Sequence, residues 1–238
     1  MADAELHVTE VISNRGGRIF VNFPLVVSVD LARLVAHCFG DGNVSMKKGE
    51  FDYVNGDIAL ISEVKKEVER VFNSLPTYEG ANGDGTYKVT FTSLIGRILE
   101  LFGAPRGSKV HSKLSVPLWV MAGSSEVKKA FLQSLFDDDG SVLFSENYRA
   151  KNVNLHFTRT VEVDDAFLNY LNDLKAMLLS LEIETTKPYS ARHYYVKDSR
   201  RIVRGILISR MSRVAAIANT PSQNVSKRAS WFFSDMAM

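Results

Sequence analysis

The chain has 238 residues, of which 45% are hydrophobic and 24% charged, as is typical of a globular protein with a core of its own. No stretch approaches the ~20 apolar residues that a membrane-spanning helix needs, so we expect a cytoplasmic protein without a membrane partner. The single cysteine, Cys38, excludes an internal disulfide and a cysteine zinc site. The net charge of +2 is too small by itself to indicate nucleic acid.

The first clear element is the segment LARLVAHCFGDGNV, residues 31–44. Apolar residues recur in it at three- and four-residue steps, which predicts an amphipathic helix over residues 31–42. We expect Gly42 to end this helix in the left-handed conformation that glycine adopts without strain. Asp41 would then lie at the helix end.

The segments that follow predict two strands and two helices. GEFDYVN and TYKVTFTS read as strands, residues 61–75 as an amphipathic helix and LIGRILELFG as a short helix. In the second strand Tyr87, Val89 and Phe91 alternate with Thr86, Lys88 and Thr90. Such alternation is typical of a sheet with one face buried on helices and one polar face exposed.

The second half of the chain repeats this order. KAFLQSLFDDDGSV, residues 129–142, predicts a helix over residues 129–140, with Asp139 at its end and Gly140 as its terminal glycine. We then expect strands in SVLFSENY and KNVNLHFT, a helix near residues 164–181, strands in IETTKPYS, ARHYYVKD and IVRGILIS, and a short helix in RMSRVAAIA.

The repeat defines the expected architecture. We assign both halves the element order αββαββα, of which the first half shows two of the four strands individually, and we predict an α+β protein with two pseudo-symmetric halves built on antiparallel sheets. The first half would comprise residues 1–120 and the second residues 121–238. The strand pattern alone favours a more general interpretation, any two-repeat α+β domain with half-exposed sheets.

Basic residues are concentrated near the end of the chain. Between Lys187 and Arg213 the only acid is Asp198, and the basic residues are Lys187, Arg192, Lys197, Arg200, Arg201, Arg204, Arg210 and Arg213. A basic segment on half-exposed strands favours binding to phosphate backbones.

Aligned as nine-residue units, LVAHCFGDG (residues 34–42) and LQSLFDDDG (residues 132–140) resemble the motif of the LAGLIDADG homing endonucleases. The resemblance covers nearly the whole chain as a single-chain, two-motif member of the archaeal or intron-encoded type. It implies that the two motif helices pair at the centre and that the two sheets form a saddle for double-stranded DNA. It also implies hydrolysis of both DNA strands by a monomer.

The resemblance assigns the candidate active site. Asp41 and Asp139 would bind two or more divalent cations, normally Mg²⁺, with Mn²⁺ or Ca²⁺ able to replace it for binding, and the backbone carbonyls of Gly40 and Asp138 would add ligands. Mg²⁺ keeps several waters and needs few carboxylates, so one aspartate per half is sufficient. The remaining catalytic candidates are Asn55, Thr158, Lys113 and Lys227.

The expected DNA contacts lie on or beside the strands. They are Lys47, Lys48, Tyr53, Lys88, Arg149, Lys151, Asn154, His156, Arg159, Arg192, Tyr194, Lys197 and Arg204. His37, inside the first motif helix, is expected to be packed or hydrogen-bonded rather than to ligate metal, because no His-x-x-x-His spacing accompanies it.

Other functions of the same fold remain open. An intron-splicing maturase or a DNA-binding regulator with little or no cleavage would have the same element order. A maturase would take the RNA of its host intron as a second partner.

Overall fold

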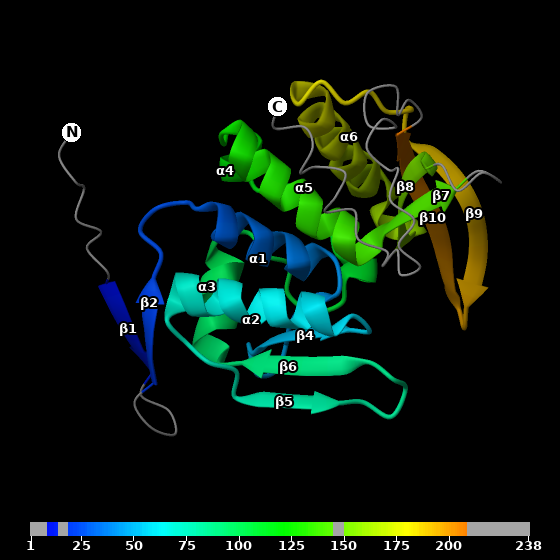
Figure 1. Ribbon diagram of the computed structural model, residues 1–238. Coiled ribbons are helices and arrows are strands. Elements are labelled where there is room, and N and C mark those ends of the chain that lie inside the picture. The colour runs from blue at the N-terminus through cyan, green and yellow to red at the C-terminus, as the bar shows by residue number, and fades with distance from the viewer. Residues whose placement is uncertain (1–8, 14–18, 145–149, 209–238) are drawn as a thin grey trace, which may run out of the picture. The chain divides into compact units, whose positions relative to one another are not determined.

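A computed structural model describes residues 9–13, 19–144 and 150–208. These residues divide into two compact units, residues 1–107 and 108–238 (Figure 1). No helix in these ranges is long and apolar enough to cross a membrane. Each unit has its own sheet and its own covering helices, and each is described separately below.

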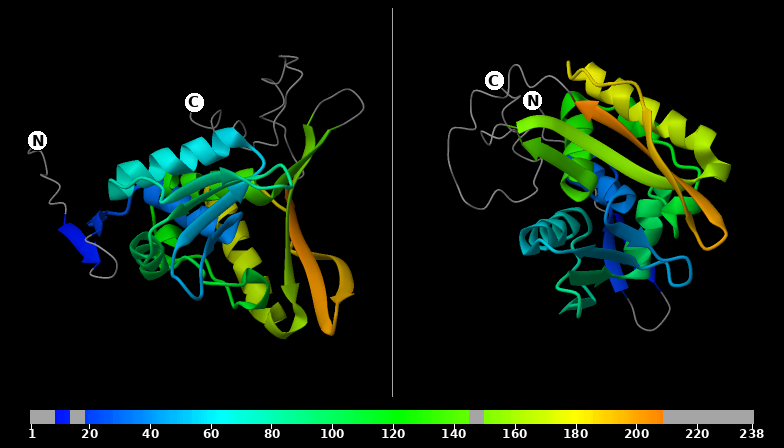
Figure 2. Two further views of the ribbon diagram at one scale, coloured as in Figure 1. Left: turned by 90° about the horizontal axis from the view of Figure 1, so that it is seen from below. Right: turned by 90° about the vertical axis from the view of Figure 1, so that its right-hand side faces the viewer.

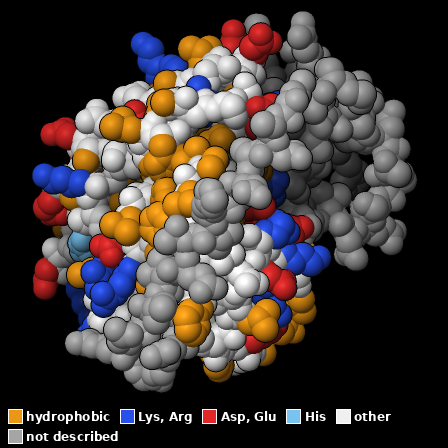
Figure 3. Space-filling model, turned by 90° about the vertical axis from the view of Figure 1, so that its left-hand side faces the viewer, with side chains coloured by type: hydrophobic (Ala, Val, Ile, Leu, Met, Phe, Trp, Pro, Cys, Tyr) orange, Lys and Arg blue, Asp and Glu red, His pale blue; other side chains and the backbone are white. Residues whose placement is uncertain are grey.

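The first unit begins with a two-stranded antiparallel hairpin, β1 (Thr9–Ser13) and β2 (Ile19–Phe23). Between β2 and the first helix the side chains of Leu25, Val26 and Val27 are exposed. Figure 3 shows exposed apolar side chains on the side of the molecule where β1 and β2 lie in Figure 1. The sequence did not predict β1, which precedes the segments with clear periodicity.

Helix α1 (Val29–Phe39) is the first motif helix. It begins at Ser28, whose hydroxyl accepts a hydrogen bond from the Leu31 amide at 3.1 Å. The residues at helical spacing, among them Leu31 and Leu34, are fully buried. The predicted helix is therefore confirmed, although it starts earlier and ends at Gly40.

A four-stranded antiparallel sheet follows α1. Its strands lie in the order β3-β4-β6-β5. They are β3 (Gly42–Val44), β4 (Phe51–Asn55), β5 (Tyr78–Ala81) and β6 (Tyr87–Phe91), with helices α2 (Ile58–Phe72) and α3 (Ser93–Leu101) completing the unit. Helix α2 packs on α1 and on strands β4 and β6, so it covers the apolar face of this sheet.

The second unit begins with a 3-10 turn, η1 (Lys109–His111), and a short helix, α4 (Leu118–Met121). Helix α5 (Ser125–Asp139) is the second motif helix, capped at Ser124. The sheet that follows has the order β7-β8-β10-β9. Its elements are β7 (Gly140–Phe144), β8 (Ala150–Thr160), η2 (Val161–Val163), α6 (Asp164–Ser180), β9 (Tyr189–Val196) and β10 (Ser199–Ile208).

The long strands β8 and β10 run antiparallel at the centre of this sheet (Figure 2). Helices α5 and α6 contact β8, and α6 also contacts β10. Numbered within its own half, each sheet has the strand order first, second, fourth, third. The α+β fold with two equivalent antiparallel halves is thus confirmed, while the last helix expected in the second half lies outside the described residues.

One predicted strand is wrong over residues 183–188, where the chain has no regular structure. Pro188 has no amide hydrogen to donate to a ladder, and β9 starts directly after it. Thr186 nevertheless stays beside β10, because its amide donates to the Leu207 carbonyl at 2.9 Å and its hydroxyl accepts from the Leu207 amide at 3.1 Å.

The left-handed glycines expected at the motif helix ends are also not observed. Gly42 opens β3, and Gly140 opens β7 with φ −76° and ψ 151°. Glycine is required for close approach instead: a Cβ on Gly42 would lie 2.7 Å from the His37 carbonyl oxygen, and one on Gly140 would overlap the Phe136 carbonyl. In both halves the chain folds back against its own helix.

Candidate functional site

The two motif aspartates lie at the same point of their halves. Asp41 stands between the α1 cap, Gly40, and the first residue of β3, and its side chain is exposed. Asp139 is the last residue of α5 and directly precedes β7. Each aspartate therefore lies at a helix-to-strand junction whose close backbone packing requires the glycine that follows it.

In the first half the structure brings Asp41 and Asn55 together. The Asn55 side-chain amide donates to Asp41 Oδ2 at 2.9 Å and to the Tyr53 hydroxyl at 3.2 Å. Its carbonyl oxygen accepts from the Asp57 backbone amide at 2.8 Å. Both ends of the Asn55 amide are thus engaged, which orients it and leaves Asp41 with a fixed donor.

Beneath this group lies a buried carboxyl that the sequence did not single out. Glu67 of α2 is 2% exposed, with Oε2 3.6 Å from His37 Nε2 and Oε1 3.7 Å from Arg33 Nη1. Burial raises the pKa of Glu67 to about 7, against the opposing charges of His37 and Arg33. The available signal was an acid three residues after the buried Val64, on the apolar stripe of α2.

The His37 ring links Glu67 to the Asp41 group. It meets the Tyr53 ring edge-on, with ring centroids 5.0 Å apart, and Tyr53 in turn holds Asn55. His37 is 3% exposed, as expected of a packed histidine. Among the described residues no group of three or more His, Cys, Asp or Glu side chains is placed to bind a metal ion.

The second half has a different neighbour for its aspartate. Arg159 is 5% exposed, its guanidinium lies over the rings of Phe157 and Phe167, and Nη1 donates to the Thr158 carbonyl at 2.8 Å. Burial lowers the pKa of Arg159, and the charges of Tyr170 and Asp139 oppose that shift. A buried cation thus stands near Asp139, where the first half has the Asn55 amide.

The sheet registers show which residues are equivalent. Gly42 pairs with Tyr53 and Gly140 pairs with Leu155, so the position that matches Asn55 is Phe157 rather than the expected Thr158. A shift of one residue moves a side chain to the opposite face of a sheet. Thr158 therefore lies on the face away from α5 and α6, while Asn55 lies on the helix-covered face of its own sheet.

The open face of the second sheet carries several of the expected DNA contacts. Ladder partners and alternation place Asn154, His156, Thr158, Arg192 and Tyr194 on one face. On this face the Tyr189 hydroxyl lies 2.6 Å from His156 Nε2, and the Arg192 guanidinium lies over the Tyr194 ring. Partial burial lowers the pKa of His156. Asn154 is 8% exposed, the most buried of the five.

Three expected DNA contacts lie on helix-covered faces instead. Tyr53 is fully buried and Arg159 is buried between rings. Arg204 forms a bidentate pair with Asp164 at the start of α6, at 2.7 and 2.6 Å. Because these side chains are engaged inside their own half, the structure does not present them as DNA contacts.

The other site candidates occupy varied places. Lys47, Lys48, Lys113 and Lys197 are exposed, and Lys88 lies 3.0 Å from Asp52. Asp138 is partly buried in the last turn of α5. Arg149 and Lys227 lie outside the described residues, and of Lys151 only the backbone is described.

No model of a known protein family matches the chain. It is 29% identical over 188 residues to the tRNA-splicing ligase RtcB of Methanopyrus kandleri, covering 73% of this chain and 18% of the ligase. RtcB of Pyrococcus abyssi is 29% identical over 169 residues, covering 66% and 18%. The replication factor C small subunit of Methanocaldococcus jannaschii is 23% identical over 167 residues, covering 65% and 9%. The chain spans less than a fifth of the length of these relatives.

Three solved structures are similar to this chain. Mesophilic variants of the homing endonuclease I-DmoI give a TM-score of 0.49 at 12% identity, covering 79% of this chain and 86% of that chain. I-DmoI in complex with DNA and Ca gives 0.45 at 12%, covering 75% and 82%. Full-length DUF199/WhiA from Thermatoga maritima gives 0.46 at 12%, covering 78% and 53%.

Proposed function

We propose that the protein is a site-specific DNA endonuclease that hydrolyses both strands with divalent metal ions. The observation that carries this proposal is the repeated junction of motif helix, aspartate, close-packed glycine and strand, found once in each half. Two such junctions supply two carboxylates from equivalent places, as a reaction on two antiparallel DNA strands requires.

The chemistry suits the available groups. A divalent cation would activate a water and stabilise charge on the scissile phosphate. Asp41 and Asp139 would hold such ions, with carbonyl ligands from Gly40 and Asp138. Mg²⁺ is the natural choice because its shell is completed by waters and phosphate oxygens rather than by a full protein cage. Asn55 would keep the Asp41 carboxylate oriented, since it already donates to Oδ2.

Double-stranded DNA would lie on the open sheet faces. His156, Thr158, Arg192 and Tyr194 share such a face in the second half, and Lys88 belongs to the open face of the first sheet. Lys113 and Lys227 would each stabilise charge at one scissile phosphate. A monomer would suffice, because one chain contains both halves.

The sequence relatives support the interpretation that this chain corresponds to a segment inserted into different host proteins, rather than to the part of those proteins that carries their own activity. A tRNA-splicing ligase and a replication factor C subunit have different activities, yet both match this chain over less than a fifth of their length. We infer that a segment common to both is separate from either activity. An endonuclease that spreads between host genes fits such a distribution.

A DNA-binding protein without cleavage is the second candidate, and one observation favours it. The positive charge of Arg159 acts on Asp139 in the second half, and a neighbouring cation weakens metal binding by a carboxylate. If that effect dominates, the protein would bind DNA and cut one strand or none. A maturase acting on its host intron RNA belongs to the same class of alternative.

Cleavage of a duplex library with randomised sequence, in Mg²⁺ and in Ca²⁺, tests the proposal. We expect defined double-strand breaks in Mg²⁺ and binding without cleavage in Ca²⁺. Asp41→Asn and Asp139→Asn should abolish cleavage with little loss of affinity, because the carboxylates hold metal rather than DNA. Asp165→Asn, an exposed acid on α6, is the matched control. Normal two-strand cutting by either motif variant would refute the assignment.

A further inference from the structure

The second unit contains a pocket at the end of its sheet that the proposed active site does not use. Its volume is about 770 Å³. Three separate segments build it: η1, the β8–η2 junction and the β9–β10 hairpin. The lining residues are His111, Thr160, Glu162, Val163, Val196, Lys197, Asp198, Ser199 and Arg201.

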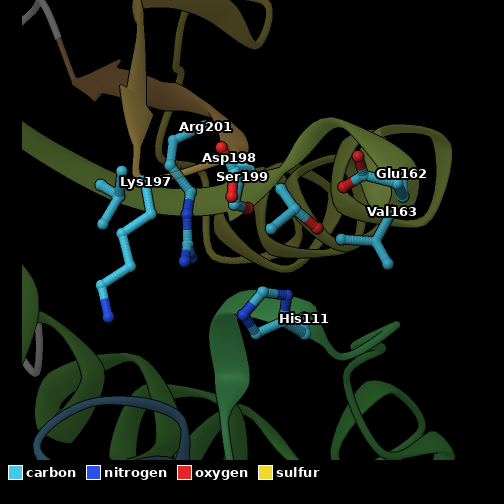
Figure 4. A pocket seen from close by; sticks show the side chains of 9 residues that line it. His111, Glu162, Val163, Lys197, Asp198, Ser199 and Arg201 are labelled. Atoms are coloured by element: carbon cyan, nitrogen blue, oxygen red, sulfur yellow. The ribbon is translucent and has the colours of Figure 1, made fainter.

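The cationic groups converge in this pocket. Lys197 and Arg201 extend from the same side of the pocket toward the level of the His111 ring, Asp198 lies beside Arg201, and Glu162 lies across the pocket beside Val163 (Figure 4). Arg201 is fixed by its ladder partners Thr160 and Tyr194. Its buried Nε has no hydrogen-bond partner among the described residues, so one polar atom of the guanidinium is left unsatisfied within the protein.

Lys197 is held in an unfavourable backbone conformation. Its φ is +52°, in the left-handed region where glycine and asparagine are common and a lysine is costly. Lys197 and Asp198 form the two-residue turn between β9 and β10, and a turn of this length requires a positive φ at its first residue. Here the strained residue directs its ammonium into the pocket (Figure 4).

The charges indicate the ligand class. Lys197 and Arg201 are balanced by Glu162 and Asp198. Glu162 stays ionised, because hydrogen bonds from its own backbone amide and from Thr160, and the charges of His111 and Arg201, lower its pKa. A site whose two cations are balanced by two acids fits a singly charged phosphodiester better than a dianionic phosphate. Arginine, lysine and hydroxyl donors are the groups that bind phosphate oxygens.

We propose that this pocket binds one phosphodiester of a nucleic-acid backbone and fixes the register of the DNA on the second sheet. The inference rests on the proposed function. Thr160, Arg201 and Val196 lie on the same open face as His156 and Arg192, so the backbone of DNA lying on that face reaches the pocket. Thr160 is five residues along β8 from Leu155, the ladder partner of Gly140, which is roughly 17 Å along the strand.

That separation predicts where the contact falls. At 3.4 Å per base pair, roughly 17 Å corresponds to about five base pairs from the position next to Asp139. Replacing single phosphates of the cleaved duplex by neutral methylphosphonates should therefore reveal one sensitive phosphate at about that distance. In Arg201→Met the same replacement should have no further effect on affinity.

Salt dependence of duplex binding gives a test that does not need cleavage. Arg201→Met and Lys197→Asn should each weaken binding about tenfold, and the double variant should reduce the slope of log K against log salt by about 0.9, the value for one shared phosphate. Two independent contacts would reduce it by about 1.8. Lys175→Met on α6, which packs on the opposite face, should leave the slope unchanged.

Stability separates a binding role from a structural one. Lys197→Asn relieves the backbone strain, so its melting temperature should equal or exceed that of the wild type while its affinity falls. A variant that loses stability and affinity together would overturn the proposal. So would an unchanged slope in the double variant.

The source of the phosphate is tested by NMR of the His111 ring. The dinucleotide TpT, with a single phosphodiester, should shift these resonances in the wild type and not in Arg201→Met. A response to inorganic phosphate alone would assign the pocket to a free ion and overturn the nucleic-acid contact. A protein that binds duplex DNA without cutting it refutes the nuclease proposal and leaves this test intact. If the protein cuts DNA and the slope of log K against log salt is unchanged in every variant, only the proposal about the pocket is refuted.

Discussion

Asp41 and Glu67 are two carboxylates of the same half in opposite surroundings. Asp41 is exposed and accepts from Asn55, whereas Glu67 is buried beside His37 and Arg33. The pattern around Asp41 recurs in the sequence, so its position at a helix end could be predicted. The partners of Glu67 lie on α1, and no local pattern predicts a contact between two helices.

Burial of Glu67 makes stability depend on pH. Its pKa of about 7 in the folded protein lies above the ordinary 4.5, so the unfolded chain releases the proton first as the pH rises. The folded state is penalised progressively between about pH 4.5 and 7, and fully above that range, by about 3 kcal/mol. Glu67→Gln should therefore be more stable than the wild type at pH 8 and similar at pH 4.5.

Urea unfolding at both pH values measures this difference, with the exposed Glu69→Gln on the same helix as control. The stability of the wild type relative to Glu67→Gln should decline from pH 4.5 to pH 8. If it does not, the Glu67 carboxyl is ionised in the folded protein without loss of stability, which contradicts the argument from burial.

The glycines after the motif aspartates provide a second prediction for single residues. Gly42→Ala and Gly140→Ala each place a methyl group against a backbone carbonyl, which cannot move without unwinding the helix end. We expect losses of about 2–4 kcal/mol in unfolding free energy. Gly83→Ala, with no atom within 4 Å of the added carbon, should be nearly neutral, and equal effects at all three sites would contradict the close-approach argument.

At the scale of elements, hydrophobic periodicity predicted α1, α2, α5 and α6 because each buries a broad apolar stripe. Strand β5 was harder to predict, since its sequence, YEGA, has no apolar alternation and its residues are mostly exposed. Strand register could not be predicted, because it depends on pairing between distant segments. An error of one residue made Asn55 and Thr158 equivalent, although they lie on opposite faces of their sheets.

The two faces of the second sheet give a prediction that separates structure from binding. Arg204 is paired with Asp164 on the helix side, whereas Arg192 lies on the open side. Arg204→Met should lower the unfolding free energy by about 1–3 kcal/mol and leave the salt dependence of DNA binding unchanged. Arg192→Met should leave the unfolding free energy unchanged and reduce the slope of log K against log salt by about 0.9.

Anisotropy titrations at several salt concentrations, together with urea unfolding of both variants, measure the two effects. An Arg204 variant with normal stability and a reduced slope would move that residue back among the DNA contacts.

At the scale of the whole molecule, the repeat was the informative signal. It predicted two equivalent halves, and the matching strand orders bear this out. The pairing of the two motif helices and the boundary at residue 120 stay predictions. Two predicted site residues, Arg149 and Lys227, lie outside the described residues.

We predict that one chain forms the complete DNA-binding protein, because each half contributes one aspartate. Light scattering of the free protein and of its complex with a duplex should give one protein copy in each. A dimer that is required for cleavage would contradict the two-half active site, since it would supply four aspartates.

Within the described residues each sheet takes all of its strands from its own half, and no strand crosses into the other. Substitutions on the open face of one sheet therefore leave the hydrogen-bonded ladder of the other untouched. Such a chain can change its recognition of one half of a DNA site while keeping the other. Over evolutionary time it could move to a new genomic location through two separate, smaller changes in specificity.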